Sequence, residues 1–219
     1  MKRYLPFVII IGVLIISTVS GMLLYRRSTQ PATTTDASSA QPAANPAHVR
    51  GETSAPVTIE EFADFQCPPC GMLHPEMKKI ETEYGSRLKV VFRQFPVVAL
   101  HKHALQAAHA AEAAGLQGRF WEMHDMLFDT QSQWDKADDV RPIFSDFARS
   151  LNLDVQRFNT DMDGTEVSKR ILEDQDRARV LRVKGTPTVF INGRLIQPAQ
   201  FSPEGLRAAI DAALREKGL

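Results

Sequence analysis

The sequence predicts an α/β fold in which a long helical segment interrupts a small sheet. Three observations carry this prediction: short apolar runs typical of strands, a hairpin signal at Asn192-Gly193, and helical periodicity from residue 101 to residue 183. In chain order they give a strand, a helix, a strand, the helical block, two strands joined by the hairpin, and a final helix. The predicted strands are 57–65, 88–95, 185–191 and 194–196.

The first helix should begin at a pair of prolines that closely follow the first strand. Pro68 and Pro69 suit the first helical turn, where backbone N–H groups have no partner within the helix. This helix should reach Gly85, with a kink at Pro75. Further predicted helices are 101–115, 120–128, 140–151, 165–183 and 203–217, and residues 155–162 form a predicted short turn.

Residues 6–25 are apolar and uncharged, which predicts a membrane-spanning helix. At a rise of ~1.5 Å per residue, such a run spans the roughly 30 Å hydrocarbon core of a bilayer. Residues 1–27 are therefore a predicted N-terminal membrane anchor, and the alternative is a cleaved secretory signal, which also begins with a basic region. Either one would deliver the rest of the chain to the periplasmic or outer side of a cell membrane, where disulfides persist.

The remaining chain divides into a linker and one folded domain. Residues 28–47 are rich in Thr, Ala, Ser and Pro, which predicts a disordered linker. Residues 48–219 are long enough for a single domain with a full core. The first 27 residues carry four basic residues and no acid, so the remainder has a net charge of −4. A mildly acidic domain has no basic surface for nucleic acid.

The chain has two cysteines, Cys67 and Cys70, and both belong to one C-x-x-C motif. A disulfide framework would need several spaced pairs, so the motif indicates either a dithiol that opens and closes or half of a metal site. Zinc needs two further ligands, and the sequence has no second C-x-x-C and no H-x₃-H. The motif therefore favours redox chemistry carried by the thiols alone, without a metal or other cofactor.

With its neighbours, this motif resembles the active site of the DsbA-type thiol–disulfide oxidoreductases, which have a thioredoxin-like fold with an inserted helical subdomain. The resemblance runs from about residue 55 to the C-terminus. It rests on an acid six residues before the first cysteine, an aromatic residue, the C-P-x-C helix start, a later proline, an aromatic segment of the insertion and a K-G-T-P-T stretch. These are Glu61, Phe65, Cys67–Cys70, Pro75, Gly118–Glu122 and Lys184–Thr188.

The resemblance implies roles for several of these residues. Pro187 should form a cis peptide bond with Thr186 beside the cysteines, where the preceding backbone would hold an extended substrate. Glu61 should lie buried beneath the cysteine pair and move protons for the deeper thiol. The alternatives are an ordinary trans Pro187 and a solvated Glu61, with Glu60 as the neighbouring candidate. The expected substrate-binding residues are Thr186, Pro68, Pro69 and Phe65.

Cys67 should be the exposed nucleophile, because unpaired N–H groups and the helix dipole stabilise a thiolate at a helix N-terminus. Cys70, one turn further on, should be the less exposed resolving thiol. The best-known oxidase of this family has a His between its cysteines, whereas Pro68 and Pro69 add neither charge nor an N–H donor. We therefore expect a pKa for Cys67 between roughly 3.5 and roughly 7, the values of DsbA and thioredoxin.

The histidines and methionines have simpler interpretations. No clean helical spacing links His101, His103 and His109, and an Ala-rich helix surface explains these histidines as well as a metal site does. His74 and His124 are given no metal-binding role either. Methionines at helical spacings should line the core or an apolar peptide groove; these are Met72, Met77, Met123 and Met126.

The leading hypothesis is an enzyme that oxidises the thiols of exported proteins through a mixed disulfide at Cys67. Its partners would be those exported proteins and a membrane redox protein of the DsbB or vitamin-K-epoxide-reductase type, and it is expected to be a monomer. One alternative is a disulfide reductase or isomerase of the envelope. The other, less favoured, is a tethered chaperone with incidental thiols.

Overall fold

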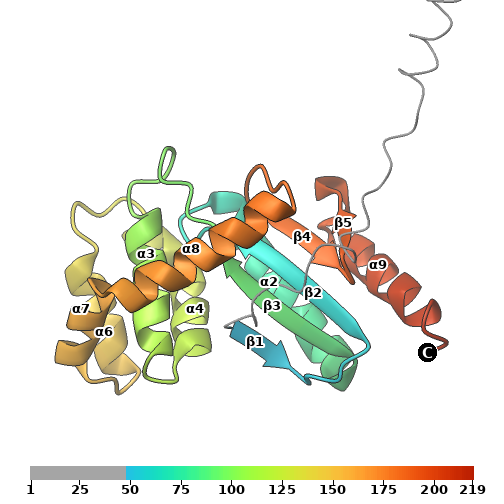
Figure 1. Ribbon diagram of the computed structural model, residues 1–219, viewed down its shortest axis with the longest axis horizontal. Coiled ribbons are helices and arrows are strands. Elements are labelled where there is room, and N and C mark those ends of the chain that lie inside the picture. The colour runs from blue at the N-terminus through green and yellow to red at the C-terminus, as the bar shows by residue number, and fades with distance from the viewer. Residues whose placement is uncertain (1–47) are drawn as a thin grey trace, which may run out of the picture. The chain divides into compact units, whose positions relative to one another are not determined.

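The computed structural model describes residues 48–219, and Figure 1 shows their helices and strands. The predicted anchor, residues 1–27, and the predicted linker, residues 28–47, lie outside the described residues. Among the helices from residue 48 onward, none is both long enough and apolar enough to cross a membrane.

Within the described residues, a five-stranded sheet in the order β1-β3-β2-β4-β5 forms the centre of the fold. The central strand β2 (Val57–Ala63) runs parallel to β3 (Leu88–Gln94) and antiparallel to β4 (Thr188–Ile191). Strand β5 (Arg194–Ile196) pairs with β4 as the predicted hairpin. The edge strand β1 (His48–Gly51) pairs with β3, and the sequence does not predict it because its four residues have no apolar alternation.

Helix α2 (Pro68–Tyr84) follows β2 and starts at the two prolines, as predicted. The helical insertion lies between β3 and β4, and α9 (Pro203–Arg215), capped by the Ser202 side chain, is the last helix. The insertion contains α3 (Ala104–Gly115), α4 (Phe120–Asp129), α5 (Gln131–Trp134), α6 (Arg141–Ser150), α7 (Val155–Met162) and α8 (Thr165–Val180). The predicted thioredoxin-like α/β fold with an inserted helical subdomain is confirmed for the described part of the chain.

Some boundaries differ from the prediction where local chemistry starts or stops an element. The predicted turn at 155–162 is helix α7, because the Asp154 side chain accepts a hydrogen bond from the Arg157 backbone N–H and caps it. Helix α8 ends at Val180, two residues before Arg182 takes a positive φ of 56°. The chain then enters β4 three residues later than predicted, after Pro187.

Helices cover both faces of the sheet. Figure 1 shows α8 crossing one face while α2 lies against the other. Successive side chains of β2 point to opposite faces: Phe62 packs with Ala178 of α8, and Ile59 packs with Met77 of α2. Glu61 shares the face of Ile59, so its carboxyl group lies on the same side of the sheet as α2.

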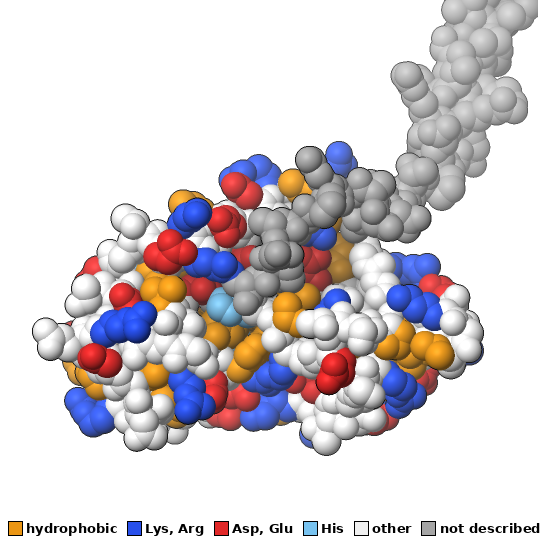
Figure 2. Space-filling view, turned by 60° about the horizontal axis from the view of Figure 1, so that its bottom comes forward, with side chains coloured by type: hydrophobic (Ala, Val, Ile, Leu, Met, Phe, Trp, Pro, Cys, Tyr) orange, Lys and Arg blue, Asp and Glu red, His pale blue; other side chains and the backbone are white. Residues whose placement is uncertain are grey.

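A second apolar cluster fills the insertion and extends to the end of β2. It joins alanines of α3 and aromatic residues of α4 and α6 to Phe65, Cys67 and Cys70. The C-x-x-C motif therefore lies where the sheet meets the insertion. Figure 2 shows one face of the molecule, on which acidic and basic side chains are interspersed.

Candidate active site

The C-x-x-C motif forms the first turn of α2. Cys67 is the N-cap residue, with extended backbone angles, and its N–H donates to the Asp64 carbonyl at 3.0 Å. The N–H groups of Cys70 and Gly71 both donate to the Cys67 carbonyl at 3.1 Å. Pro68, directly after Cys67, is exposed and has no N–H. The hydrogen bonds that close the first helical turn therefore come from the N–H groups of Cys70 and Gly71.

The Cys67 side chain is less accessible than the sequence suggests. Cys67 is 5% exposed and Cys70 is 0% exposed, so the predicted order of accessibility holds but the prediction of an exposed nucleophile is wrong. The cause is a loop 119 residues further along the chain, where the Thr186 carbonyl oxygen accepts a hydrogen bond from the Cys67 thiol at 3.5 Å. Pro69, by contrast, is exposed at the start of the helix.

The peptide bond between Thr186 and Pro187 is cis, as the resemblance implied. The carbonyl group of this peptide bond, that of Thr186, is the one that contacts Cys67 Sγ. The Thr188 hydroxyl donates to the Gly185 carbonyl at 2.7 Å and closes the same turn. The structure thus brings together Cys67, Cys70, Thr186 and Pro187, four of the residues that the sequence singles out.

The two cysteines differ strongly in acidity. The pKa of Cys67 is lowered from 9.0 to about 6, chiefly by a hydrogen bond from the Cys70 side chain, against the opposing effect of burial. Hydrogen bonds from the Thr186 side chain and the Cys70 backbone lower it further. The pKa of Cys70 is raised well above its ordinary value, first by burial and then by its hydrogen bond with Cys67. At neutral pH this favours a Cys67 thiolate that accepts a hydrogen bond from the Cys70 thiol, over the Cys67 thiol that donates to the Thr186 carbonyl.

Glu61 is the buried acid on the α2 side of the sheet. It is 5% exposed, and burial, followed by the negative charge of Glu81, raises its pKa from 4.5 to about 8. Its charge in turn contributes to the raised pKa of Cys70. Glu60, the alternative candidate, points to the opposite face and binds Arg93 and Arg177 at 2.9 and 3.0 Å. Of the two acids, Glu61 is thus the one that lies on the α2 side of the sheet and acts electrostatically on Cys70.

Asp64 fixes the turn that leads into the motif, and sequence reasoning missed it. Its carboxylate accepts hydrogen bonds from the backbone N–H groups of Gln66 and Val97, both at 2.8 Å. His101 Nδ1 lies 2.7 Å from the same group. Gln66 is a local partner, but Val97 and His101 come from a loop more than thirty residues away, so no local pattern could have identified these two contacts.

Gln131 ties the helical insertion to the motif and was also missed. Its Nε2 donates to the carbonyl oxygens of Phe65 at 2.6 Å and Cys67 at 3.1 Å. A Cβ atom at Gly71 would come within 2.5 Å of Gln131 Oε1, so the glycine permits this close approach. The insertion thus holds the backbone of Phe65 and Cys67 in place.

Phe65 lies in the core, whereas it was expected to be a substrate-binding residue. It is 1% exposed and its ring contacts those of Phe92, Phe128 and His124, with centroids 5.2, 4.8 and 5.6 Å away. The expectation that Phe65 binds substrate is therefore wrong. Its role is to anchor the active-site turn in the core.

Of the three histidines expected on an Ala-rich helix surface, His101, His103 and His109, only His109 lies on one, in α3. His74, His103 and His124 are buried, and His101 contacts Asp64. His109 is only half-buried. Met77 and Met123 are core residues, as expected, whereas Met72, next to the motif on α2, is exposed.

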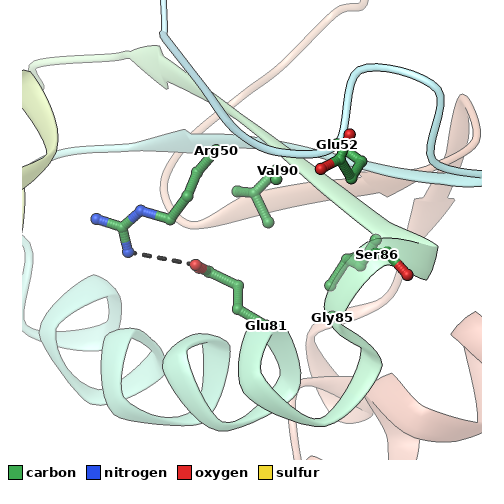
Figure 3. A pocket seen from close by; sticks show the side chains of 8 residues that line it. Arg50, Glu52, Glu81, Gly85, Ser86 and Val90 are labelled. Carbon is green, nitrogen blue, oxygen red and sulfur yellow. Dashed lines mark hydrogen bonds and ion pairs between the residues drawn. The ribbon is translucent and has the colours of Figure 1, made fainter.

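One cavity in the described domain lies away from the cysteines. Figure 3 shows this cavity, about 280 Å³ in volume, beside the Arg50–Glu81 ion pair. Its other lining residues come from β1, the loop after β1, the 3₁₀ turn that follows α2 (Gly85–Arg87) and β3. No residue of the C-x-x-C motif or of the cis-proline turn lines it. A smaller cleft of about 220 Å³ is bounded by Val183, Pro187 and Phe190 and adjoins the cis-proline turn.

The fold and the dithiol define a thioredoxin-type protein. A family model described as Thioredoxin matches residues 43–212, and the chain belongs to this thioredoxin family. Its fold is that of the DsbA-type thiol–disulfide oxidoreductases. It is similar to BdbD from Bacillus subtilis (24% identity, TM-score 0.67, covering 76% of this chain and 92% of that one). It also resembles α-DsbA1 from Wolbachia pipientis (21% identity, TM-score 0.68, covering 83% and 97%).

Two further proteins are similar to this chain. A thioredoxin-like oxidoreductase from Silicibacter pomeroyi is 26% identical, with a TM-score of 0.62, covering 83% of this chain and 98% of that one. The Na(+)/H(+) antiporter NhaA 3 of Salinispora tropica is 42% identical over 166 residues, which are 76% of this chain and 24% of the antiporter. The chain thus spans about a quarter of the length of the curated relatives that it matches.

Proposed function

We propose that this protein is a thiol–disulfide oxidoreductase that oxidises the thiols of exported proteins outside the cytoplasm. The observation that carries the proposal is the opposite perturbation of the two thiols. Cys67 has a pKa of about 6, whereas that of Cys70 is raised well above its ordinary value. One cysteine of the pair is thus a stable thiolate and good leaving group, and the other is a thiol that holds its proton.

The cycle would begin with a disulfide between Cys67 and Cys70. A substrate thiolate attacks Cys67 Sγ, so that a bond forms between substrate sulfur and Cys67 while the Cys67–Cys70 bond breaks. Cys70 leaves as a thiolate and takes up a proton. A second substrate thiolate then attacks the substrate sulfur of the mixed disulfide and releases the Cys67 thiolate. The substrate loses two electrons, which the Cys67/Cys70 dithiol now holds.

Glu61 is the proposed proton donor to Cys70. With a pKa of about 8, its carboxyl group is protonated at neutral pH and can supply the proton that the leaving Cys70 thiolate needs. In the reverse direction, when the dithiol is reoxidised, the Glu61 carboxylate would accept that proton. Among the described residues, no other acid on the α2 face of β2 is both buried and raised in pKa to about 8.

Substrate would bind beside the cis-proline turn. The Thr186 backbone and the exposed prolines Pro68 and Pro69 border Cys67, and the cleft next to Pro187 offers apolar walls for a side chain of the substrate. Because Cys67 is almost covered, we propose that an extended peptide displaces the Thr186 contact as it approaches.

The proposed partners and location are supported by the sequence. The apolar segment at residues 6–25 supports a single membrane anchor with the catalytic domain on the outer or periplasmic side. Reoxidation of the dithiol requires a disulfide or quinone-linked acceptor, which we propose to be a membrane protein of the DsbB or vitamin-K-epoxide-reductase type. The enzyme would work as a monomer, since each chain supplies the whole proposed site.

The proposal is tested by incubating the oxidised protein with a reduced, unfolded secretory protein. Disulfides should appear in the substrate, and neither Cys67→Ser nor Cys70→Ser should form any, because neither variant can carry the Cys67–Cys70 disulfide. Given a substrate that already has a disulfide, Cys70→Ser should accumulate a mixed disulfide at Cys67, since its thiolate attacks the substrate disulfide, releases one substrate thiolate and has no second cysteine to resolve the product. A Cys67→Ser variant that handles clients as well as the wild type would contradict the proposal and favour the tethered chaperone with incidental thiols.

A reductase or isomerase is the second candidate, and one observation favours it. The Cys67 pKa of about 6 is nearer to the roughly 7 of thioredoxin than to the roughly 3.5 of DsbA. Equilibration with glutathione separates the two functions: an oxidase should have a potential of about −180 mV or higher, whereas a value near the roughly −270 mV of thioredoxin would favour reduction.

A further inference from the structure

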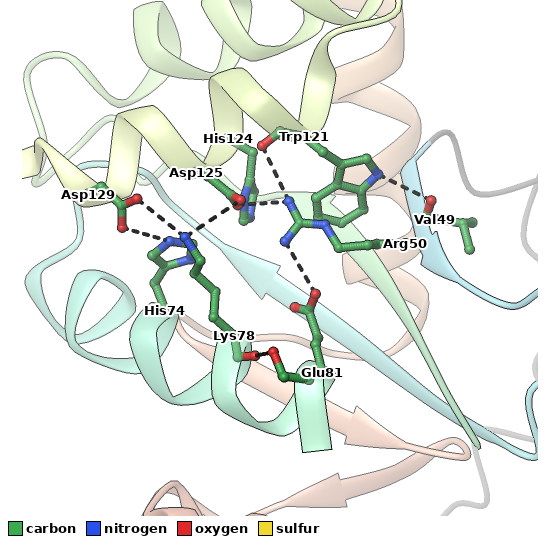
Figure 4. Close-up of polar contacts among 10 residues, drawn as sticks. Val49, Arg50, His74, Lys78, Glu81, Trp121, His124, Asp125 and Asp129 are labelled. Carbon is green, nitrogen blue, oxygen red and sulfur yellow. Dashed lines mark hydrogen bonds and ion pairs between the residues drawn. The ribbon is translucent and has the colours of Figure 1, made fainter. Parts of the chain in front are cut away.

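Helices α2 and α4 bring two histidines and two aspartates together where the sheet meets the insertion. Figure 4 shows His74 of α2 next to His124, Asp125 and Asp129 of α4. One possible ligand atom from each of His74, His124 and Asp125 lies within 4.8 Å of the others. The proposed thiol chemistry uses none of these residues, although His74 follows Cys70 by one helical turn.

Two nitrogen–oxygen distances in this cluster are close to those around a tetrahedral metal ion. His74 Nε2 lies 3.2 Å from Asp129 Oδ1, and His124 Nδ1 lies 2.8 Å from Asp125 Oδ1. Around Zn²⁺ with bonds of ~2.0–2.1 Å, neighbouring tetrahedral ligand atoms are roughly 3.3 Å apart. Each of the two nitrogen–oxygen distances is therefore close to the distance between two neighbouring ligand atoms around such an ion.

His74 Nε2 is a buried polar atom without a hydrogen-bond partner. The His74 side chain is 4% exposed, and within the described residues its Nε2 makes no hydrogen bond of acceptable geometry, even to Asp129. A buried polar group left unpaired costs ~1–3 kcal/mol. A metal ion in this position would use the free lone pair of the nitrogen.

The types of donor also suit metal binding. The cluster offers imidazole nitrogens from His74 and His124 and carboxylate oxygens from Asp125 and Asp129, a donor set that Zn²⁺ accepts. Both histidines are buried, so solvent does not surround their side chains.

A side-chain cation already lies beside the carboxylates. Lys78 Nζ is 3.4 Å from Asp129 Oδ2 and 3.8 Å from Asp125 Oδ2, and the side chain is 42% exposed, so it can swing into solvent. Arg50 is held more firmly, because it binds Asp125 at 2.8 Å and stacks on Trp121 at 4.2 Å. Arg50 can therefore orient the Asp125 carboxylate, as outer partners of metal ligands do.

We propose that His74, His124, Asp125 and Asp129 form a binding site for a divalent transition metal ion of the Zn²⁺ type. The ion would displace the Lys78 ammonium group and join α2, which carries the dithiol, to α4 of the insertion. This inference does not rest on the proposed function, because none of the four ligands is part of the thiol chemistry.

The test is a Zn²⁺ titration of the full chain with Cys67 and Cys70 oxidised to the disulfide, so that no thiolate can bind the metal. Competition with a chromophoric chelator should give one bound ion per chain, and Co²⁺ in its place should give the visible spectrum of a tetrahedral nitrogen–oxygen site. The Lys78→Met variant should bind Zn²⁺ severalfold more tightly, since a competing ion pair has been removed.

Asp129→Asn and His74→Gln should each weaken Zn²⁺ binding at least about tenfold. Asp129 is half exposed, so Asp129→Asn keeps the test valid even if the buried histidine cannot be replaced without unfolding. His109→Gln, a half-buried histidine of α3, is the matched control and should leave the affinity unchanged. The proposal is overturned if the oxidised wild type binds no Zn²⁺, if Asp129→Asn and Lys78→Met leave the affinity unchanged, or if His109→Gln weakens it equally.

Discussion

Replacing Glu61 with glutamine should make the stability of the protein less dependent on pH. The Glu61 pKa rises from 4.5 to about 8 on folding because the carboxylate loses its hydration. Between these two values the folded protein holds a proton that the unfolded chain has released, so the free energy of unfolding falls as the pH rises. At about 1.4 kcal/mol per pKa unit, the full loss above pH 8 is roughly 5 kcal/mol.

Glutamine is a neutral isostere of the protonated acid, so Glu61→Gln should resemble the wild type near pH 4 and be the more stable protein at high pH. We expect an advantage of at least ~2 kcal/mol above pH 8, with roughly 5 kcal/mol as the upper limit because water can partly hydrate a buried carboxylate. Urea unfolding of both oxidised proteins from pH 4 to pH 9 measures this difference in the free energy of unfolding, since neither cysteine titrates in the disulfide form.

Glu60→Gln is the matched control from the neighbouring position. It removes the ion pairs with Arg93 and Arg177 on the other face of the sheet, so it should destabilise the protein by ~3–5 kcal/mol instead. A constant difference between Glu61→Gln and the wild type from pH 4 to pH 9, within about 0.5 kcal/mol, would refute the assignment of Glu61 as the buried, protonated acid.

Three further predictions concern the active-site turn. Cys70→Ala removes the main donor to the thiolate, so the pKa of Cys67 should rise above about 6 toward its ordinary value; thiolate absorbance that titrates as in the wild type would contradict this. Pro69→His adds a side-chain donor and should lower the same pKa by roughly one unit, and an unchanged or higher value would count against the account. Phe65→Ala should lower the free energy of unfolding by ~3–5 kcal/mol in urea, whereas a loss below about 1 kcal/mol would indicate a surface residue.

The sequence predicts the parts of the fold that local patterns encode. The strands around Asn192-Gly193, the helix start at Pro68 and the position of the insertion all follow from periodicity and turn chemistry. The choice between Glu60 and Glu61 also depends on strand alternation, but the sequence alone does not say which face of β2 meets α2. Only the packing of Ile59 against α2 decides it.

The remaining site features depend on contacts between distant segments. The near-complete burial of Cys67 comes from the Thr186 turn, and the hydrogen bonds of Gln131 join segments more than sixty residues apart. His74 and His124 likewise lie fifty residues apart in the sequence and meet only when α4 packs on α2. Residue type and spacing carry no signal for such contacts, because nothing in the local pattern distinguishes these side chains from ordinary helix residues.

The direction of electron flow is the central claim, and thiol trapping in living cells tests it most directly. Cells that express the full chain are quenched with acid and alkylated, and the redox state of Cys67 and Cys70 is read from the mass of the protein. We predict that the pair is mostly a disulfide at steady state, as an oxidase needs. A pair found mostly as two free thiols would contradict the claim and identify a reductase or isomerase.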